Sequence, residues 1–296
     1  MLLVLLDGVG LAPAALGNPL ATAPMPVLHE LLGGPLTIER VHRRPGLCLR
    51  AVDATLGVPG LPQSATGQTS LYTGTNAARR LGHHVAAFPG PRLRALLERR
   101  SLFRTLERCR LSFTLANAYS PRYAELVEER RLRWPASVRA LWAAGGRLRG
   151  PSDLARGEAV TWDLERDHWA GGELGVPRTT AEEAGQDLAR LAAAHRLTLF
   201  ETHLTDLAGH GRYGLEADTA LRRVDGLLAG VIAGVASHVT VVVVSDHGNL
   251  EESGHHRHTR NPVPLLALGE HAANFRRVRS LVGVAPVVVR TLGLRG

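Results

Sequence analysis

The stretch Val239-Thr-Val-Val-Val-Val-Ser-Asp-His-Gly-Asn249 decides the fold expected for this chain. Its first six residues are apolar or β-branched, which is typical of a strand buried on both faces of a parallel sheet. Polar residues follow at once, and in open α/β sheets ligands bind beyond the carboxyl ends of the strands. We therefore expect Asp246 and His247 to lie in a functional site at one edge of a sheet.

Further strands and helices are predicted on either side of this stretch. Apolar runs predict buried strands at 2–6, 111–115 and 197–200, and apolar residues at helical spacing predict helices at 26–32, 93–99, 180–194 and 219–235. This alternation indicates an α/β protein with a mostly parallel sheet and helices on both faces. The opening MLLVLL resembles a signal-peptide core, but no basic residue precedes it and Asp7 interrupts it. We interpret it as a buried strand that delivers Asp7.

The length of 296 residues allows one large domain, or a core with a second unit. Residues 91–189 contain all four tryptophans and have weaker periodicity, and none of the metal-ligand candidates described below falls among them. We predict a core formed by residues 1–90 and 190–296. Residues 91–189 would form a small inserted α+β cap.

The charge of the chain favours an anionic small molecule over nucleic acid. The formal net charge is +8, and every one of the 35 basic residues is an arginine. These arginines are scattered, and aromatic residues make up only 4% of the chain, which is too few for a base-stacking platform. No apolar run approaches the ~18–20 residues that would span a bilayer, so we expect no membrane partner.

The cysteines favour a reducing compartment. Cys48 and Cys109 are the only two in the chain, and their spacing does not argue for a disulfide. We expect a cytoplasmic protein. Nothing in the sequence indicates an oligomeric state.

Candidate metal ligands follow the predicted strands. They are Asp7, Asp206, His210, Asp246, His247 and His258. Asp206 and His210 are four residues apart, so a helical turn places both on one face. Each residue alone could have a structural role, in a turn, a helix cap or a solvated loop. Six uncompensated Asp and His side chains at one sheet edge would be costly unless cations satisfied them, and this mixture of oxygen and nitrogen ligands suits Mn²⁺ or Zn²⁺.

A loop with the sequence Leu-Pro-Gln-Ser-Ala-Thr-Gly-Gln-Thr, residues 61–69, supplies candidate nucleophiles. It leads into a helical pattern at 71–78. Hydroxyl residues before a helix are most often N-caps. The same helix N-terminus would also favour an alkoxide or a phosphate. Ser64 and Thr66 both fit either role, and the pattern does not choose between them.

Together these segments resemble the metalloenzyme branch of the alkaline phosphatase superfamily, which includes cofactor-independent phosphoglycerate mutase and phosphopentomutase. The resemblance covers residues 1–90 and 190–296. Its motifs occur in the family's order: a strand ending in Asp-Gly, a Ser-x-x-Gly loop, Asp-x-x-x-His, Ser-Asp-His-Gly-Asn and His-Thr-x-Asn-Pro-Val-Pro.

The resemblance implies a two-metal enzyme that transfers phosphoryl groups. One ion would be held by Asp206, His210 and His258, and the other by Asp7, Asp246 and His247. Ser64, three residues before the loop glycine, would be the nucleophile in preference to Thr66, and would also contact the second ion.

A phosphatase acting on a small anionic phosphate ester is the preferred interpretation of the resemblance, and a phosphomutase is the alternative. Sulfate or phosphonate esters, or a non-catalytic metal-binding role, come after these. Cofactor-independent phosphoglycerate mutases have a much larger insertion and a lysine near the transferred phosphate. This chain has no lysine, which argues against activity on phosphoglycerate.

Overall fold

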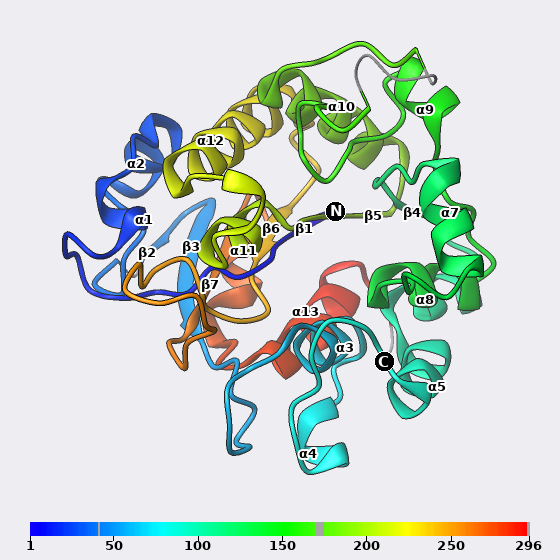
Figure 1. Cartoon of the computed structure of the whole chain (residues 1–296), viewed down its shortest axis with the longest axis horizontal. Coiled ribbons are helices and arrows are strands. Elements are labelled where there is room, and N and C mark those ends of the chain that lie inside the picture. The colour runs from blue at the N-terminus through cyan, green and yellow to red at the C-terminus, as the bar shows by residue number, and fades with distance from the viewer. Residues whose placement is uncertain (41, 170–174, 295–296) are drawn as a thin grey trace.

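The computed structural model describes residues 1–40, 42–169 and 175–294. A seven-stranded sheet, in the order β2-β3-β7-β6-β1-β5-β4, forms its centre (Figure 1). The strands are β1 (Leu2–Leu6), β2 (His42–Arg44), β3 (Leu47–Val52), β4 (Phe113–Leu115), β5 (Leu197–Thr202), β6 (Val241–Val244) and β7 (Val263–Leu268). The pairs β4–β5, β5–β1 and β1–β6 are parallel, whereas β6–β7, β7–β3 and β3–β2 are antiparallel. Only β7 and β2 therefore run against the other described strands, and the expected mostly parallel sheet is confirmed.

Strand β1 explains why the opening run is apolar without interruption. It lies between β5 and β6, with Leu2 opposite both Thr198 and Val241. Leu3 and Leu5 enter the hydrophobic cluster on one face of the sheet, and the alternate residues Leu2, Val4 and Leu6 enter the cluster on the other. Because both faces are covered, neither set of side chains reaches solvent.

Helices cover both faces of the sheet, as expected (Figure 1). On one face lie α2 (Pro26–Leu32), α10 (Ala181–Ala194) and α12 (Ala217–Gly234). On the other lie α3 (Ser64–Thr73), α5 (Pro91–Arg100), α6 (Leu102–Arg108), α8 (Ala136–Ala143) and α13 (Val284–Thr291). Shorter helices are α1 (Pro19–Thr22), α4 (Ala77–Leu81), α7 (Pro121–Glu128), α9 (Pro151–Ala155) and α11 (Leu204–Gly209). No helix in the described ranges is both long and apolar enough to cross a bilayer.

The structure differs locally from the sequence-based expectations. Strands β2, β3 and β7 were not predicted. Within β7, Pro264 removes a backbone donor, which usually argues against a strand, and it lies opposite Ala51 of β3. The predicted strand at 111–115 is shortened to Phe113–Leu115. The helix predicted at 71–78 is wrong: α3 covers Ser64–Thr73, Gly74 ends it in a left-handed conformation, and α4 begins at Ala77. The first turn of α3 carries small polar residues instead of an apolar stripe.

Part of the expected cap packs with the sheet. Strand β4 pairs with β5 at the sheet's outer edge, so it does not lie between the strands that carry the candidate ligands. Helices α5, α6 and α8 share a hydrophobic cluster with Leu3 and Leu5 of β1. We propose that a separate cap, within the predicted residues 91–189, is confined to the region around a small cluster of its own. That cluster contains Ala118, Leu154, Ala159, Trp169 and Val176.

Helices α10 and α12 approach each other closely through glycine. A Cβ atom at Gly230 would lie 1.9 Å from the carbonyl oxygen of Glu182. We expect Gly230→Ala to lower the free energy of unfolding by about 1–3 kcal/mol through overpacking, although alanine is the better helix former. Urea denaturation measures this change. Gly90→Ala, where an added Cβ meets nothing within 4 Å, is the control. Equal stability of Gly230→Ala and the wild type would contradict the predicted close packing.

Candidate metal centre

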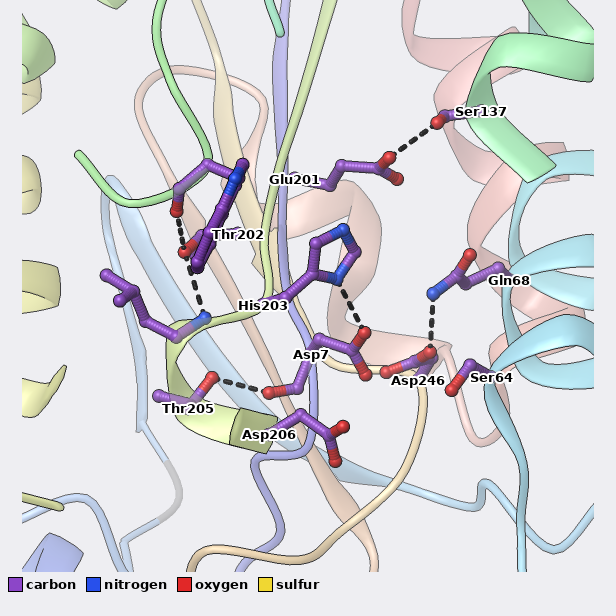
Figure 2. Close-up of polar contacts among 12 residues, drawn as sticks. Asp7, Ser64, Gln68, Ser137, Glu201, Thr202, His203, Thr205, Asp206 and Asp246 are labelled. Atoms are coloured by element: carbon purple, nitrogen blue, oxygen red, sulfur yellow. Dashed lines mark hydrogen bonds and ion pairs between the residues drawn. The ribbon is translucent and has the colours of Figure 1, made fainter. Parts of the chain in front are cut away.

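The six candidate ligands converge beyond the carboxyl ends of three adjacent parallel strands. Asp7 directly follows β1, the pair Asp246 and His247 follows β6, and Asp206 lies on α11 just after β5. His210 caps the end of α11, and His258 lies in the loop before β7. Figure 2 shows the carboxylates of Asp7, Asp206 and Asp246 gathered near the hydroxyl of Ser64. The topology thus brings together residues that are far apart in the sequence.

The first set of side chains has the spacing of a metal site. His210 Nε2 lies 3.1 Å from His258 Nε2 and 3.4 Å from Asp206 Oδ1, and His258 Nε2 lies 3.6 Å from the same oxygen. A tetrahedral ion with bonds of about 2.0–2.1 Å separates its ligand atoms by about 3.3 Å. These three atoms therefore fit around one divalent cation.

The second set of side chains centres on His247. Its Nε2 lies 3.1 Å from Asp7 Oδ1, 3.9 Å from Asp246 Oδ2 and 3.0 Å from the hydroxyl of Ser64. The ring of His247 also stacks on that of His258, with centroids 3.7 Å apart. The two sets therefore adjoin, and His247 is close enough to Asp206 and His258 to be grouped with them as well.

Backbone carbonyls fix the orientation of all three imidazoles. The Nδ1 atoms of His210 and His258 each lie 2.8 Å from a carbonyl oxygen, those of His256 and Pro62. His247 Nδ1 lies 3.3 Å from the carbonyl of Gly248. A carbonyl oxygen only accepts, so each Nδ1 is the donor. Each Nε2 thereby keeps its lone pair toward the centre, as in metal-ligating histidines.

Buried oxygens without hydrogen-bond donors also fit a pair of cations. Asp7 Oδ1 and Asp246 Oδ1 are both inaccessible to solvent and make no hydrogen bond. Buried carboxylate oxygens are normally satisfied, because desolvating them otherwise costs free energy. A divalent cation is a partner that fits both oxygens.

The pKa values of the candidate ligands reflect their burial and the closeness of their charges. Burial raises the pKa of Asp246 well above its usual range, and the charge of Asp7 adds to this shift. Burial acts to raise the pKa of Asp7 as well, but the hydrogen bond from His203 and the closeness of His247 outweigh it, so that pKa is lowered. Burial lowers the pKa of His258 to about 4, which leaves its imidazole neutral at pH 7.

Three residues that the sequence analysis did not single out hold the carboxylates in place. His203 Nδ1 donates to Asp7 Oδ2 at 2.8 Å, Gln68 Nε2 donates to Asp246 Oδ2 at 3.0 Å, and Asn249 Nδ2 donates to Asp206 Oδ1 at 2.8 Å. Their positions carry a signal that could have revealed them. His203 directly follows β5, Gln68 lies one turn after Ser64, and Asn249 ends the Ser-Asp-His-Gly-Asn motif.

The structure separates the two candidate nucleophiles. Ser64 is the first residue of α3, and Gln63 is the N-cap, so the N-capping interpretation of Ser64 is wrong. Its hydroxyl instead faces His247. The hydroxyl of Thr66 donates to the carbonyl of Gln63 at 3.0 Å and accepts from the backbone of Val85 at 3.3 Å. Thr66 is therefore occupied by local backbone groups.

Glycine 67 allows the nucleophile loop to approach the metal ligands. A Cβ atom at Gly67 would lie 2.8 Å from the carbonyl oxygen of Asp246. Any side chain at this position would push α3 away from the end of β6. The glycine at position 67 thus has a direct steric reason.

A cavity of about 460 Å³ opens onto this centre. Ser64, Asp7, Asp206 and Gln68 form its floor, and the residues of its walls come from several other segments. A volume in this range suits a small-molecule site.

Comparisons with known proteins support the resemblance seen in the motifs. Residues 170–295 match the model of the Metalloenzyme superfamily. A 2,3-bisphosphoglycerate-independent phosphoglycerate mutase of Desulforudis audaxviator is 41% identical over 97 residues, covering 30% of this chain and 19% of the relative. The curated relatives match this chain over only 19% to 28% of their own lengths.

Solved structures share the fold over the whole chain. Alkaline phosphatase from the Antarctic bacterium TAB5 superposes with a TM-score of 0.54 at 9% identity, covering 100% of this chain and 98% of that one. Phosphoglycerate mutase of Leishmania mexicana superposes with a TM-score of 0.53 at 13% identity, covering 100% and 95%. The expected alkaline phosphatase-like fold is confirmed, and the family match indicates divalent metal ions.

Proposed function

We propose that this chain, which resembles the Metalloenzyme superfamily, is a two-metal enzyme that hydrolyses a small phosphate monoester through a phosphoserine at Ser64. The observation that carries the proposal is the position of the Ser64 hydroxyl. It lies at the N-terminus of α3, 3.0 Å from His247 Nε2, and it lines the cavity. No other hydroxyl candidate of the 61–69 loop combines these features.

The chemistry follows from this arrangement. Asp206, His210 and His258 would hold one ion, and Asp7, Asp246 and His247 the other. Such ions, when bound, lower the pKa of a serine hydroxyl and stabilise charge on phosphate oxygens. The Ser64 oxygen forms a bond to phosphorus while the bond to the leaving alcohol breaks. Water then cleaves the phosphoserine and restores Ser64. The amides of the first turn of α3 favour the negative phosphate throughout.

A phosphomutase is the second candidate function. The curated relatives are phosphoglycerate mutases, and a mutase differs only in that the phosphoryl group returns to another hydroxyl of the retained product. We prefer the hydrolase because no described residue of the cavity wall is an arginine that could retain an anionic product. Three further statements stay predictions: the lesser alternative of activity on sulfate or phosphonate esters, the use of Mn²⁺ or Zn²⁺, and the cytoplasmic location.

The test uses the purified chain, stripped of metal and reloaded with Mn²⁺ or Zn²⁺. We expect phosphate release from small monoesters in the reloaded protein and none after chelation. Mass spectrometry of acid-quenched enzyme would locate a phosphate on Ser64. Isomerised ester without phosphate release would favour the mutase, and the absence of both products and of phosphoserine would overturn the proposed function.

A further inference from the structure

Six aromatic side chains line the cavity that Ser64 also lines. They are Phe88, Tyr119, Tyr123, Trp162, Trp169 and Tyr213. They come from distant parts of the chain, so no single local motif produces the clustering. Tyr119 and Tyr123 pack edge to face, with ring centroids 5.3 Å apart. Aromatic residues form only 4% of this protein, and their concentration here therefore calls for a physical explanation.

Basic side chains are scarce among the described residues that line this cavity. The chain has 35 arginines, but none of the described residues lining this cavity is an arginine. The lining groups able to carry positive charge are two histidines, and both face carboxylates. His168 Nδ1 lies 2.9 Å from Asp163 Oδ2, and His203 Nδ1 lies 2.8 Å from Asp7 Oδ2. His203 is engaged with a candidate metal ligand, and His168, whose side chain is 54% exposed, leaves only its Nε2 for a second anionic group.

We propose that the alcohol part of the ester is uncharged and carries an aromatic ring. The proposal rests on the phosphoesterase function above and names its substrate class. The phosphate would lie at the floor beside Ser64, and the ring would lie among the aromatic side chains of the wall. Aromatic pairs gain from edge-to-face and offset-stacked contacts beyond simple burial.

A second anionic group would be disfavoured at this wall. The faces of aromatic rings carry partial negative charge, so they attract cations and repel carboxylates. A carboxylate placed among these rings would lose its hydration, and no arginine of the described lining would compensate for that loss. The wall therefore discriminates against esters such as phosphoglycerate.

Three esters of primary alcohols test this inference, because their leaving groups are chemically alike. They are 2-phenylethyl phosphate, propyl phosphate and 3-(phosphonooxy)propanoate. With the metal-loaded full-length enzyme, we expect kcat/KM for the phenylethyl ester to exceed that of the propyl ester by about tenfold or more. We expect the carboxylate-bearing ester to fall below the propyl ester by about tenfold.

Two variants assign the preference to the wall. Tyr213 is 81% exposed and lines the cavity, so Tyr213→Ala should fold normally and reduce the ratio of phenylethyl to propyl activity severalfold. Leu132→Arg should raise the relative activity on the carboxylate-bearing ester, because it adds the missing cation. Ile232→Ala removes a 39% exposed apolar side chain of α12 that lies outside the lining, and it should leave all three ratios unchanged.

The outcomes separate this inference from the function on which it rests. Turnover without a preference for the phenyl ring, or with a preference for the carboxylate, overturns the substrate class and leaves the phosphoesterase intact. The same holds if Tyr213→Ala and Ile232→Ala change the ratios equally. Absence of turnover for every ester, together with absence of phosphoserine, overturns the function itself.

Discussion

Ser64→Ala is expected to lower kcat/KM for ester hydrolysis by about 10⁴-fold or more, while the protein stays folded and keeps its metal ions. Loss of a nucleophile has effects of this size in other enzymes. Stability should change little, because Ser64 makes no N-cap hydrogen bond and alanine is a good helix former. Its one side-chain contact, to His247, contributes only about 1 kcal/mol.

Three measurements decide this prediction. They are steady-state kinetics, the metal content of the protein and thermal unfolding, each made on Ser64→Ala and on Thr66→Val. Thr66→Val serves as the matched variant, since it removes the other hydroxyl of the same helix turn. If Ser64→Ala remains active and Thr66→Val is inactive with its metal intact, Thr66 is the nucleophile and our assignment is wrong.

Asp246→Asn should remove one metal ion and lower kcat/KM by about 10³-fold or more. Metal ions contribute several kcal/mol to stabilising charge in phosphoryl transfer, and each 1.4 kcal/mol corresponds to a factor of ten. The difference in thermal stability between this variant and the wild type should change sign when metal is added. In chelator, Asp246→Asn should unfold at a higher temperature than the wild type, because a buried carboxylate oxygen without a donor is gone.

With Mn²⁺ or Zn²⁺ in excess, the wild type should unfold at a higher temperature than Asp246→Asn, because the wild type gains more free energy from metal binding. Asp225→Asn is the control, since Asp225 is also a buried carboxylate but binds the backbone of Val27 and Leu28 in α2. It should lose stability under both conditions and keep both metal ions. A full metal content in Asp246→Asn would remove Asp246 from the ligand set.

The sequence predicted those parts of the fold and site that depend on strand ends. The continuous apolar runs of β1 and β6 located Asp7, Asp246 and His247, because a strand buried on both faces has one recognisable pattern. The start of α3 was missed, since its first turn consists of small polar residues that give no apolar stripe. Strand β7 was not predicted either; it contains Pro264, which is unusual inside a strand, and pairing with β3 and β6 on both sides holds it in the sheet.

The walls of the cavity could not be predicted at all. Tyr213 and Trp162 are 51 residues apart, and only the folded chain brings them to one cavity. Their local sequences contain no periodicity that points to a site, and a lone aromatic residue in a loop has many structural roles. Glu201 illustrates the same limit. Its carboxylate is buried and accepts a hydrogen bond of 2.6 Å from Ser137. The sequence shows only an acidic residue at the end of a predicted strand, which does not indicate whether that residue is buried.

The central position of β1 imposes an order on folding. Its two neighbours in the sheet are residues 197–202 and 241–244, so during synthesis this apolar strand emerges long before either partner exists. Contacts of such large sequence separation form slowly, and an unpaired apolar strand is prone to association with other chains. Refolding should therefore be slow and sensitive to protein concentration. The nascent chain would need shielding until about residue 244 has left the ribosome.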